Sequence, residues 1–278
     1  MMNNSIYPCL WFDGNAKEAA TFYCNTFRHS KIVSENPMVV IFHLEDMKFM
    51  ALNGGAQFKP SAATSFFITF EDAGVLNKTW DTLSEGGFVF MPLDKYDWSE
   101  RYGWVQDKFG ISWQLALGDI KNTGDNFVPT FLFCGEHQGQ AEQAINFYTS
   151  LFKNSSITGI LKYESGATKG QIMHAQFNLN GKVFMAMDSG VPQPFTFTEG
   201  ISNVIECDTQ KEIDYFWNAF TQEGEESMCG WCKDQFGVWW QVIPSNLGQL
   251  MGDPSRAEKV TAAFMKMKKF DIAALENA

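Results

Sequence analysis

The segment with the clearest chemical potential is Cys229-Gly-Trp-Cys232, in which two thiols are separated by two residues. Such a pair can be a redox dithiol when it opens a helix, or half of a zinc site when a second pair or histidines follow. The choice between these roles depends on the element that carries the two cysteines. The other four cysteines, at positions 9, 24, 134 and 207, are scattered along the chain.

An internal repeat identifies that element. The segment RYGWVQDKFGISWQL, from Arg101, aligns with MCGWCKDQFGVWWQV, from Met228, and the starts of the two halves, at residues 7–27 and 128–152, also align. The cysteines therefore fall on a strand expected near 228–233. Side chains at positions i and i+3 of a strand point to opposite faces, so we expect two ordinary half-buried thiols rather than a redox or zinc pair.

The hydrophobic periodicity runs in the same order through each half. A strand, a helix and three strands are followed by a second such set, which predicts an α+β fold of four βαβββ modules forming two cupped mixed sheets. We expect two tandem domains, at residues 1–118 and 126–278, joined by the Gly- and Asn-rich segment GDIKNTGDN. The second domain ends in a charged helix after Asp253-Pro254, which we expect to pack on its own domains or on a second subunit.

Composition narrows the classes of partner. The chain has 278 residues, is 45% hydrophobic and carries a formal charge of −11, which disfavours nucleic acid and anionic membranes as partners. No apolar run approaches the roughly 20 residues of a membrane span, and the first residues lack the pattern of a signal peptide. We therefore expect a cytoplasmic protein with reduced thiols.

The motifs of both halves resemble those of the vicinal-oxygen-chelate superfamily, which includes glyoxalase I, bleomycin-resistance proteins and extradiol dioxygenases. The chain is most similar to the PhnB-like branch, whose members are often named 3-demethylubiquinone-9 3-methyltransferase-like. The resemblance covers nearly the whole chain. It is carried by Pro8, Phe12, Gly14-Asn15-Ala16, Phe22-Tyr23, the segment Asp107-x-Phe109-Gly110-x-x-Trp113, their counterparts in the second half, and the tail from Asp253.

The resemblance implies that two modules form a U-shaped sheet around a pocket, with a metal ligand on the first and last strand of each module. In this sequence those positions fall on Tyr7, Ala51, Ser65 and Gln114 in the first half and on Val128, Ala186, Ser202 and Gln241 in the second. None is a histidine or a carboxylate, so we expect no metal. We expect no other cofactor either, because the glycine pairs at 54–55 and 86–87 lack the glycine-rich motif of S-adenosylmethionine enzymes.

Strand alternation from these mapped positions predicts which side chains line the two pockets. The expected ligand-binding residues are Tyr7, Trp11, Asn53, Ser65 and Gln114 in the first half and Thr130, Phe184, Ser202, Trp239 and Gln241 in the second. The tryptophans at 104, 113, 231 and 240 recur at equivalent places in both halves, which indicates structural packing.

Three residues of the second half are candidate catalytic groups. Asp188 and Glu206 supply two carboxylates to one expected pocket, where one of them would have a raised pKa and act as a general base. His174 lies where PhnB-like proteins often have a histidine. The alternatives are that Asp188 belongs to the turn before Ser189-Gly190 and that His174 is a hydrogen-bonded strand histidine.

These observations favour a metal-independent protein that binds a small molecule, or an enzyme of unassigned reaction, with its site in the second-half pocket. The alternatives are a metal-dependent enzyme of glyoxalase or dioxygenase type and a drug-sequestering resistance protein. The tandem domains within one chain imitate the dimers of single-domain relatives, so we expect a monomer or a homodimer.

Overall fold

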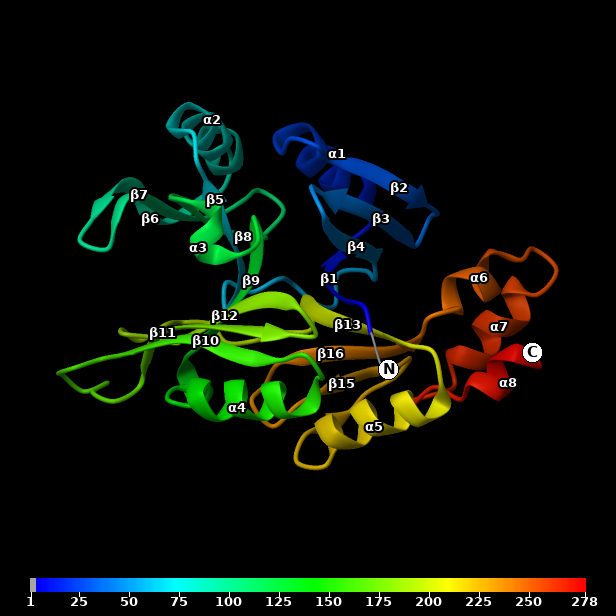
Figure 1. Ribbon diagram of the computed structural model, residues 1–278. Helices are drawn as coiled ribbons and strands as arrows, with labels where there is room; N and C mark the ends of the chain where they lie inside the picture. The colour runs from blue at the N-terminus through cyan, green and yellow to red at the C-terminus, as the bar shows by residue number, and fades with distance from the viewer. Residues whose placement is uncertain (1–3) are drawn as a thin grey trace. The chain divides into compact units, whose positions relative to one another are not determined.

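The computed structural model describes residues 4–278, which carry four successive βαβββ modules (Figure 1). The first two modules consist of β1 (Ile6–Phe12), α1 (Ala16–Thr26), β2 (Lys31–Glu35), β3 (Val39–Leu44) and β4 (Met47–Asn53), then β5 (Thr64–Phe70), α2 (Ala73–Ser84), β6 (Phe88–Tyr96), β7 (Ser99–Gln106) and β8 (Ser112–Leu117). The short helix α3 (Ile120–Thr123) connects the two halves.

The second half follows the same plan. Its elements are β9 (Phe127–Phe133), the 3-10 turn η1 (Gly135–His137), α4 (Ala141–Leu151), β10 (Ser156–Lys162), β11 (Ile172–Leu179), β12 (Lys182–Asp188), β13 (Ile201–Cys207), α5 (Gln210–Thr221), β14 (Glu225–Glu226), β15 (Trp231–Lys233) and β16 (Trp239–Pro244). Three helices complete the chain: α6 (Leu247–Gly252), α7 (Ala257–Phe264) and α8 (Ile272–Glu276). The predicted α+β class and module order are therefore confirmed. No helix among residues 4–278 is both long and apolar enough to cross a membrane.

The second and third modules form one eight-stranded mixed sheet. Its strand order is β10-β11-β12-β9-β5-β8-β7-β6, and its centre is the antiparallel pair β5–β9, in which Ser65 lies opposite Thr130. The neighbouring pairs β12–β9 and β5–β8 are parallel. The expectation that the two modules of one half share a sheet is therefore wrong for these modules. Strand pairing between modules is a long-range choice that leaves no mark in local periodicity.

The chain divides into two compact units whose bounds differ from those of the sequence repeats. One unit is Pro8–Ile201, and the other comprises residues up to Tyr7 together with Ser202–Ala278. In the first unit, β1 is followed by β4, β3 and β2 in strand order, in addition to the eight-stranded sheet. In the second unit the order is β14-β15-β16-β13, and α5 packs on these strands.

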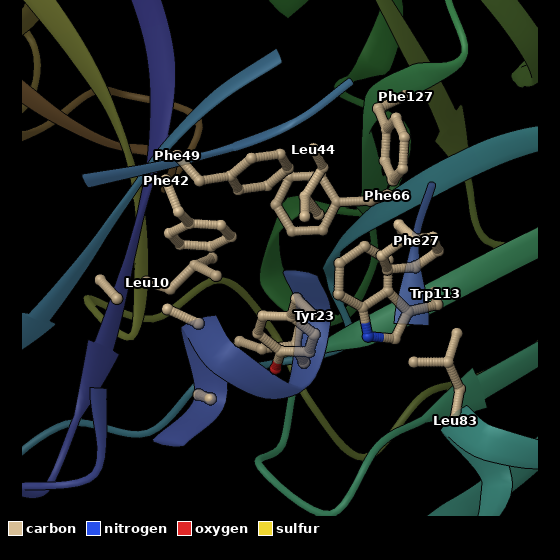
Figure 2. Packing of buried hydrophobic residues seen from close by; sticks show 14 of the residues in the cluster. Leu10, Tyr23, Phe27, Phe42, Leu44, Phe49, Phe66, Leu83, Trp113 and Phe127 are labelled. Atoms are coloured by element: carbon tan, nitrogen blue, oxygen red, sulfur yellow. The ribbon is translucent and has the colours of Figure 1, made fainter. Parts of the chain in front are cut away.

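A large aromatic core holds the Pro8–Ile201 unit together. Figure 2 shows Tyr23 of α1 beside Trp113 of β8, with ring centroids 5.2 Å apart, and the stacked pair Phe42 and Phe49. Alanines at positions 16, 19 and 20 are fully buried, so α1 lies close to β3 and β4. Phe66 completes the centre of this cluster.

The Asp-x-Phe-Gly-x-x-Trp segment is a structural turn. The Asp107 carboxylate accepts hydrogen bonds from the backbone N–H groups of Phe109 (2.8 Å) and Ile111 (3.1 Å) and from the indole Nε1 of Trp113 (2.7 Å). Asp234 makes the same three bonds in the second half. Each turn thus ties a buried carboxylate to the first residues of the module's last strand.

The segment around the cysteine pair differs from the prediction. The strand expected at 228–233 begins only at Trp231, and Cys229 lies in a turn with φ +59°. The backbone N–H of Cys229 donates to the carbonyl oxygen of Met267 at 2.7 Å, and the backbone N–H of Gly230 donates to the carbonyl oxygen of Lys268 at 2.7 Å. The C-terminal tail therefore packs on its own unit, where it lies beside this turn.

Candidate functional site

The eight-stranded sheet has two chemically different faces. Phe66 and Trp113 are buried in the apolar core with residues of α1 and α2, and Phe131 packs against Tyr148 of α4. The opposite surface, which we call the polar face, carries the alternate residues. Its members, followed through the strand registers, are Ser65, Phe67, Tyr102, Trp104, Ser112, Gln114, Val128, Thr130, His174, Gln176 and Met185.

A row of hydrogen-bonded neutral groups crosses the polar face. The Tyr102 hydroxyl donates to Gln114 Oε1 at 2.7 Å, and Gln114 Nε2 donates to Ser65 Oγ at 2.8 Å. Gln114 is only 4% exposed and Ser65 only 1% exposed. Burial raises the pKa of the Tyr102 hydroxyl, with a smaller contribution from Tyr96, so this hydroxyl keeps its proton at neutral pH.

This row has hydrogen-bonding capacity left. A primary amide has two N–H donors and two carbonyl lone pairs, and Gln114 uses one of each within residues 4–278. Thr130 lies opposite Ser65 and donates to the carbonyl oxygen of Val128 at 3.1 Å, while Trp104 Nε1 donates to Ser112 Oγ at 2.7 Å. The row can therefore offer both a donor and an acceptor to a bound molecule.

Apolar side chains surround the row. Val128, Val183 and Met185 form a buried cluster against which Phe67 packs. The Phe67 ring stacks on Tyr102, with centroids 6.4 Å apart and an interplanar angle of 29°. A few polar groups among apolar and aromatic side chains are typical of a small-molecule site.

His174 is half-buried on β11, and the strand register places it on the polar face. Burial lowers the pKa of its imidazole below the usual value of 6.5, so the ring is neutral at pH 7. It can donate or accept a hydrogen bond there but adds no charge to the surface. The expectation that it is catalytic stays a prediction.

The structure directs three predicted site residues to the other face. Phe184 packs against Phe131, with ring centroids 5.9 Å apart. The Asp188 carboxylate accepts bonds from the backbone N–H groups of Ala141 (3.1 Å) and Ile172 (2.9 Å), and Asn53 accepts from Ala16 N (2.9 Å). The predicted orientation of Asn53, Phe184 and Asp188 is therefore wrong.

The physical reason is a one-residue error in alternation on β4 and β12. Thr130 lies beside Met185 in the sheet, so Phe184 and Asp188 have the opposite parity. Burial raises the pKa of the Asp188 carboxyl, and the backbone hydrogen bonds partly offset that effect. Asp188 thus holds the N-terminus of α4, and it belongs to a different compact unit from Glu206.

The remaining predicted residues lie on strands β1, β13 and β16. In the unit that contains the C-terminus, Gln241 Nε2 donates to Ser202 Oγ at 2.9 Å, which repeats the bond between Gln114 and Ser65. Trp240 stacks on Phe220 of α5, so its neighbours Trp239 and Gln241 lie on the face of the sheet opposite α5. Within the same unit, the Tyr7 hydroxyl donates to Glu206 Oε1 at 2.7 Å.

Trp11 belongs to the Pro8–Ile201 unit. Its Nε1 donates to the carbonyl oxygen of Gly55 at 2.7 Å, and its ring lies edge-on to Phe58.

The donor set does not fit a divalent metal ion. The polar face offers hydroxyl, amide and thioether groups at Ser65, Gln114, Thr130 and Met185 and a single imidazole at His174, whereas a divalent ion needs about three anionic or imidazole ligands. Within residues 4–278, no three His, Cys, Asp or Glu side chains are grouped to hold one.

The cysteine pair is a poor redox centre as well. Neither Cys229 nor Cys232 forms a disulfide, and burial raises the pKa of both thiols, whereas a reactive dithiol has a lowered thiol pKa.

Sequence reasoning missed the role of the hairpin β6–β7 in this surface. It treated Tyr102 only as the counterpart of Cys229 and Trp104 only as a packing residue. The available signal was the alternation Tyr102-x-Trp104, followed by Ser112-x-Gln114 after a turn, because residues two apart on paired strands share one face.

Comparisons with known proteins place these features in context. The model of one protein family, described as 3-demethylubiquinone-9 3-methyltransferase, matches the chain twice, at residues 4–116 and 125–243. A PhnB protein from Bacillus cereus is 32% identical over 40% of this chain and 98% of its own, with a TM-score of 0.38. A Staphylococcus aureus protein is 31% identical over 43% of this chain and 100% of its own, with a TM-score of 0.20.

One likeness spans both halves of the chain. Glyoxalase I from Zea mays is 13% identical over 89% of this chain and 96% of its own, with a TM-score of 0.58. At that identity the likeness concerns the fold alone. No functionally curated protein matches the chain.

Proposed function

Because this chain belongs to the 3-demethylubiquinone-9 3-methyltransferase family, within the vicinal-oxygen-chelate superfamily, we propose that it binds a small uncharged organic molecule without a metal ion. The proposed site is the polar face. The observation that carries the proposal is the buried row Tyr102–Gln114–Ser65, which presents neutral donors and acceptors among apolar side chains.

Charge and burial favour an uncharged ligand. An ion transferred to this surface would lose hydration without an opposite charge among Ser65, Tyr102, Gln114 and Thr130 to replace it. A primary carboxamide, in contrast, can pair with the Gln114 amide, donating to its Oε1 and accepting from its Nε2. Methyl transfer from S-adenosylmethionine is not part of the proposed function, because the sequence lacks the glycine-rich turn that such enzymes use.

Two carboxamides test the proposal, benzamide and cyclohexanecarboxamide, each titrated by ligand-observed NMR into protein dialysed against EDTA. Both should bind, and Gln114→Met, which keeps the side-chain length but removes the amide, should weaken binding about tenfold through the loss of one or two neutral hydrogen bonds. Gln241→Met is the matched control, since Gln241 makes the same bond to a serine in the other copy. Binding that needs added metal, or that survives Gln114→Met unchanged, would refute the proposal.

A second candidate function rests on Glu206. Its hydrogen bond from the Tyr7 hydroxyl fixes a carboxylate on the same face of its strand as Ser202, an arrangement suited to general acid–base catalysis. Glu206→Gln should abolish any reaction that uses this carboxylate as its general acid or base while leaving carboxamide binding intact. A loss of carboxamide binding in this variant would contradict the division between the two sites.

A further inference from the structure

Resting on the proposed function, the structure points to a ligand class: we infer that the polar face takes a planar aromatic molecule, recognised by an aromatic wall. The wall consists of Tyr96, Trp98 and Tyr102, all from the β6–β7 hairpin. The polar row supplies hydrogen bonds to a substituent of the ring, and the wall supplies the surface on which the ring lies.

The three rings of the aromatic wall hold one another in place. Tyr96 and Trp98 stack with centroids 5.0 Å apart and an interplanar angle of 26°. The Tyr102 ring meets both of them nearly edge-on, at 5.8 Å from Tyr96 and 6.0 Å from Trp98. Trp98 is nevertheless 67% exposed, so a rigidly supported indole faces solvent at the hairpin turn.

The wall and the polar row meet in a single residue. The Tyr102 ring contacts Trp98 and also stacks on Phe67, while its hydroxyl donates to Gln114. A ring placed against the wall therefore lies within reach of the row that would bind its polar substituent. Trp104, two residues along the strand, extends the aromatic surface through its stack on Phe90 at 4.4 Å.

Charge on the hairpin argues for a neutral ring rather than an anionic one. Lys95 Nζ contacts both Glu100 carboxylate oxygens at 2.9 Å, so its charge is already paired. Asp94 and Asp97 leave the hairpin turn acidic. An aromatic carboxylate would meet these charges, whereas an aromatic amide would not.

A purely structural role for Trp98 is the competing explanation, because aromatic pairs across strands stabilise hairpins by themselves. The two roles differ in ligand discrimination. A structural Trp98 affects all ligands of the polar face alike. A ligand-contacting Trp98 distinguishes a flat ring from a puckered ring that carries the same amide.

Ligand-observed NMR with three probes tests the inference on the full-length protein. We expect benzamide to bind about tenfold more tightly than cyclohexanecarboxamide and than benzoate. Trp98→Ala should remove most of the preference for benzamide and leave cyclohexanecarboxamide unchanged, and Trp98→Phe should restore most of it. Tyr215→Ala, which removes an exposed ring on α5, is the control and should change neither affinity.

Each contrary result has a distinct meaning. Equal binding of the two carboxamides, or a Trp98→Ala variant with unaltered preference, overturns the aromatic ligand class. If carboxamide binding is nevertheless weakened by Gln114→Met, the proposed function is retained and only the aromatic ligand class is rejected. If neither carboxamide binds the unaltered protein, both proposals are rejected. Circular dichroism of the variants establishes that each remains folded, so that a lost preference is a change in binding.

Discussion

Replacing Asp107 by Asn gives a sharp test of how the buried turn is stabilised. The carboxylate serves three donors, and burial raises the pKa of Asp107 from 3.8 to about 6 despite those bonds. The asparagine keeps the shape and one carbonyl oxygen. Its NH2 group faces the Trp113 indole N–H, so one buried donor loses its partner, at a cost of about 1–3 kcal/mol.

The pH dependence has a defined sign. Because the pKa is higher in the folded protein than in the unfolded chain, the stability linked to this group is fully present below about pH 4 and is lost as pH rises through about 6. The loss amounts to about 3 kcal/mol, since one pKa unit corresponds to about 1.4 kcal/mol. At pH 4 the wild type should therefore be more stable than Asp107→Asn by about 1–3 kcal/mol, and at pH 7 this advantage should vanish or reverse.

Urea unfolding followed by circular dichroism at pH 4, 5, 6 and 7 measures this difference. Carboxyls whose pKa values are lowered, such as Asp72 and Asp214, occur in both proteins and cancel in the comparison. Asp81→Asn, at an exposed position on α2, is the control and should show no such trend. A wild-type advantage that grows from pH 4 to pH 7 would show that the carboxylate is stabilised by its surroundings, and the reasoning would fail.

Three further predictions concern structural positions. Asp188→Ala should lower the free energy of unfolding by about 2–4 kcal/mol by leaving two buried N–H groups unpaired, whereas Asp188→Asn, whose NH2 group would face the Ile172 N–H and leave one of them unpaired, should cost about 1–3 kcal/mol in the same urea assay. Gly200→Ala should cost about 3 kcal/mol, because the added Cβ would lie 2.1 Å from the carbonyl carbon of Lys59; an unaltered urea midpoint would contradict that packing. Cys229 and Cys232 should alkylate slowly with iodoacetamide at pH 7, and rapid labelling of either would revive a redox role.

The sequence predicted the order of the helices and strands but not which strands pair with one another. Repeated motifs and hydrophobic periodicity correctly predicted four βαβββ modules and all four module helices, because these features are local. The strand that pairs with β5 could not be predicted from such local features. Its pairing with β9 joins Ser65 to Thr130, a contact between two modules that no local pattern encodes.

The candidate site was harder to predict than the fold, because side chains alternate between the two faces of a strand and an error of one residue assigns them to the wrong face. An error of one residue on β12 moved Asp188 from the face that packs on α4 to the polar face in the prediction, and the same error on β4 moved Asn53. Ser65, Gln114 and Thr130 lie together on the face opposite the helices because of the registers of β5 with β8 and with β9, and their role in ligand binding stays a prediction. Tyr102 was missed because its counterpart is a cysteine.

Comparison of the two copies separates structural residues from those free to diverge. The turn built on Asp107 is repeated at Asp234 with the same three bonds, and the Gln114–Ser65 bond also recurs in the second copy.

The two copies differ in the residues around the shared glutamine–serine pair. The position of Tyr102, which completes the row and joins the aromatic wall, is Cys229 in the second copy, and that of Thr69 is Glu206. The β6–β7 hairpin that carries Trp98 shrinks to the two-residue β14 and the short β15. Under the proposed function, a shared glutamine–serine pair with different surroundings should give two surfaces of different ligand preference. Aromatic recognition should therefore belong to the first of them, and carboxylate chemistry to the second.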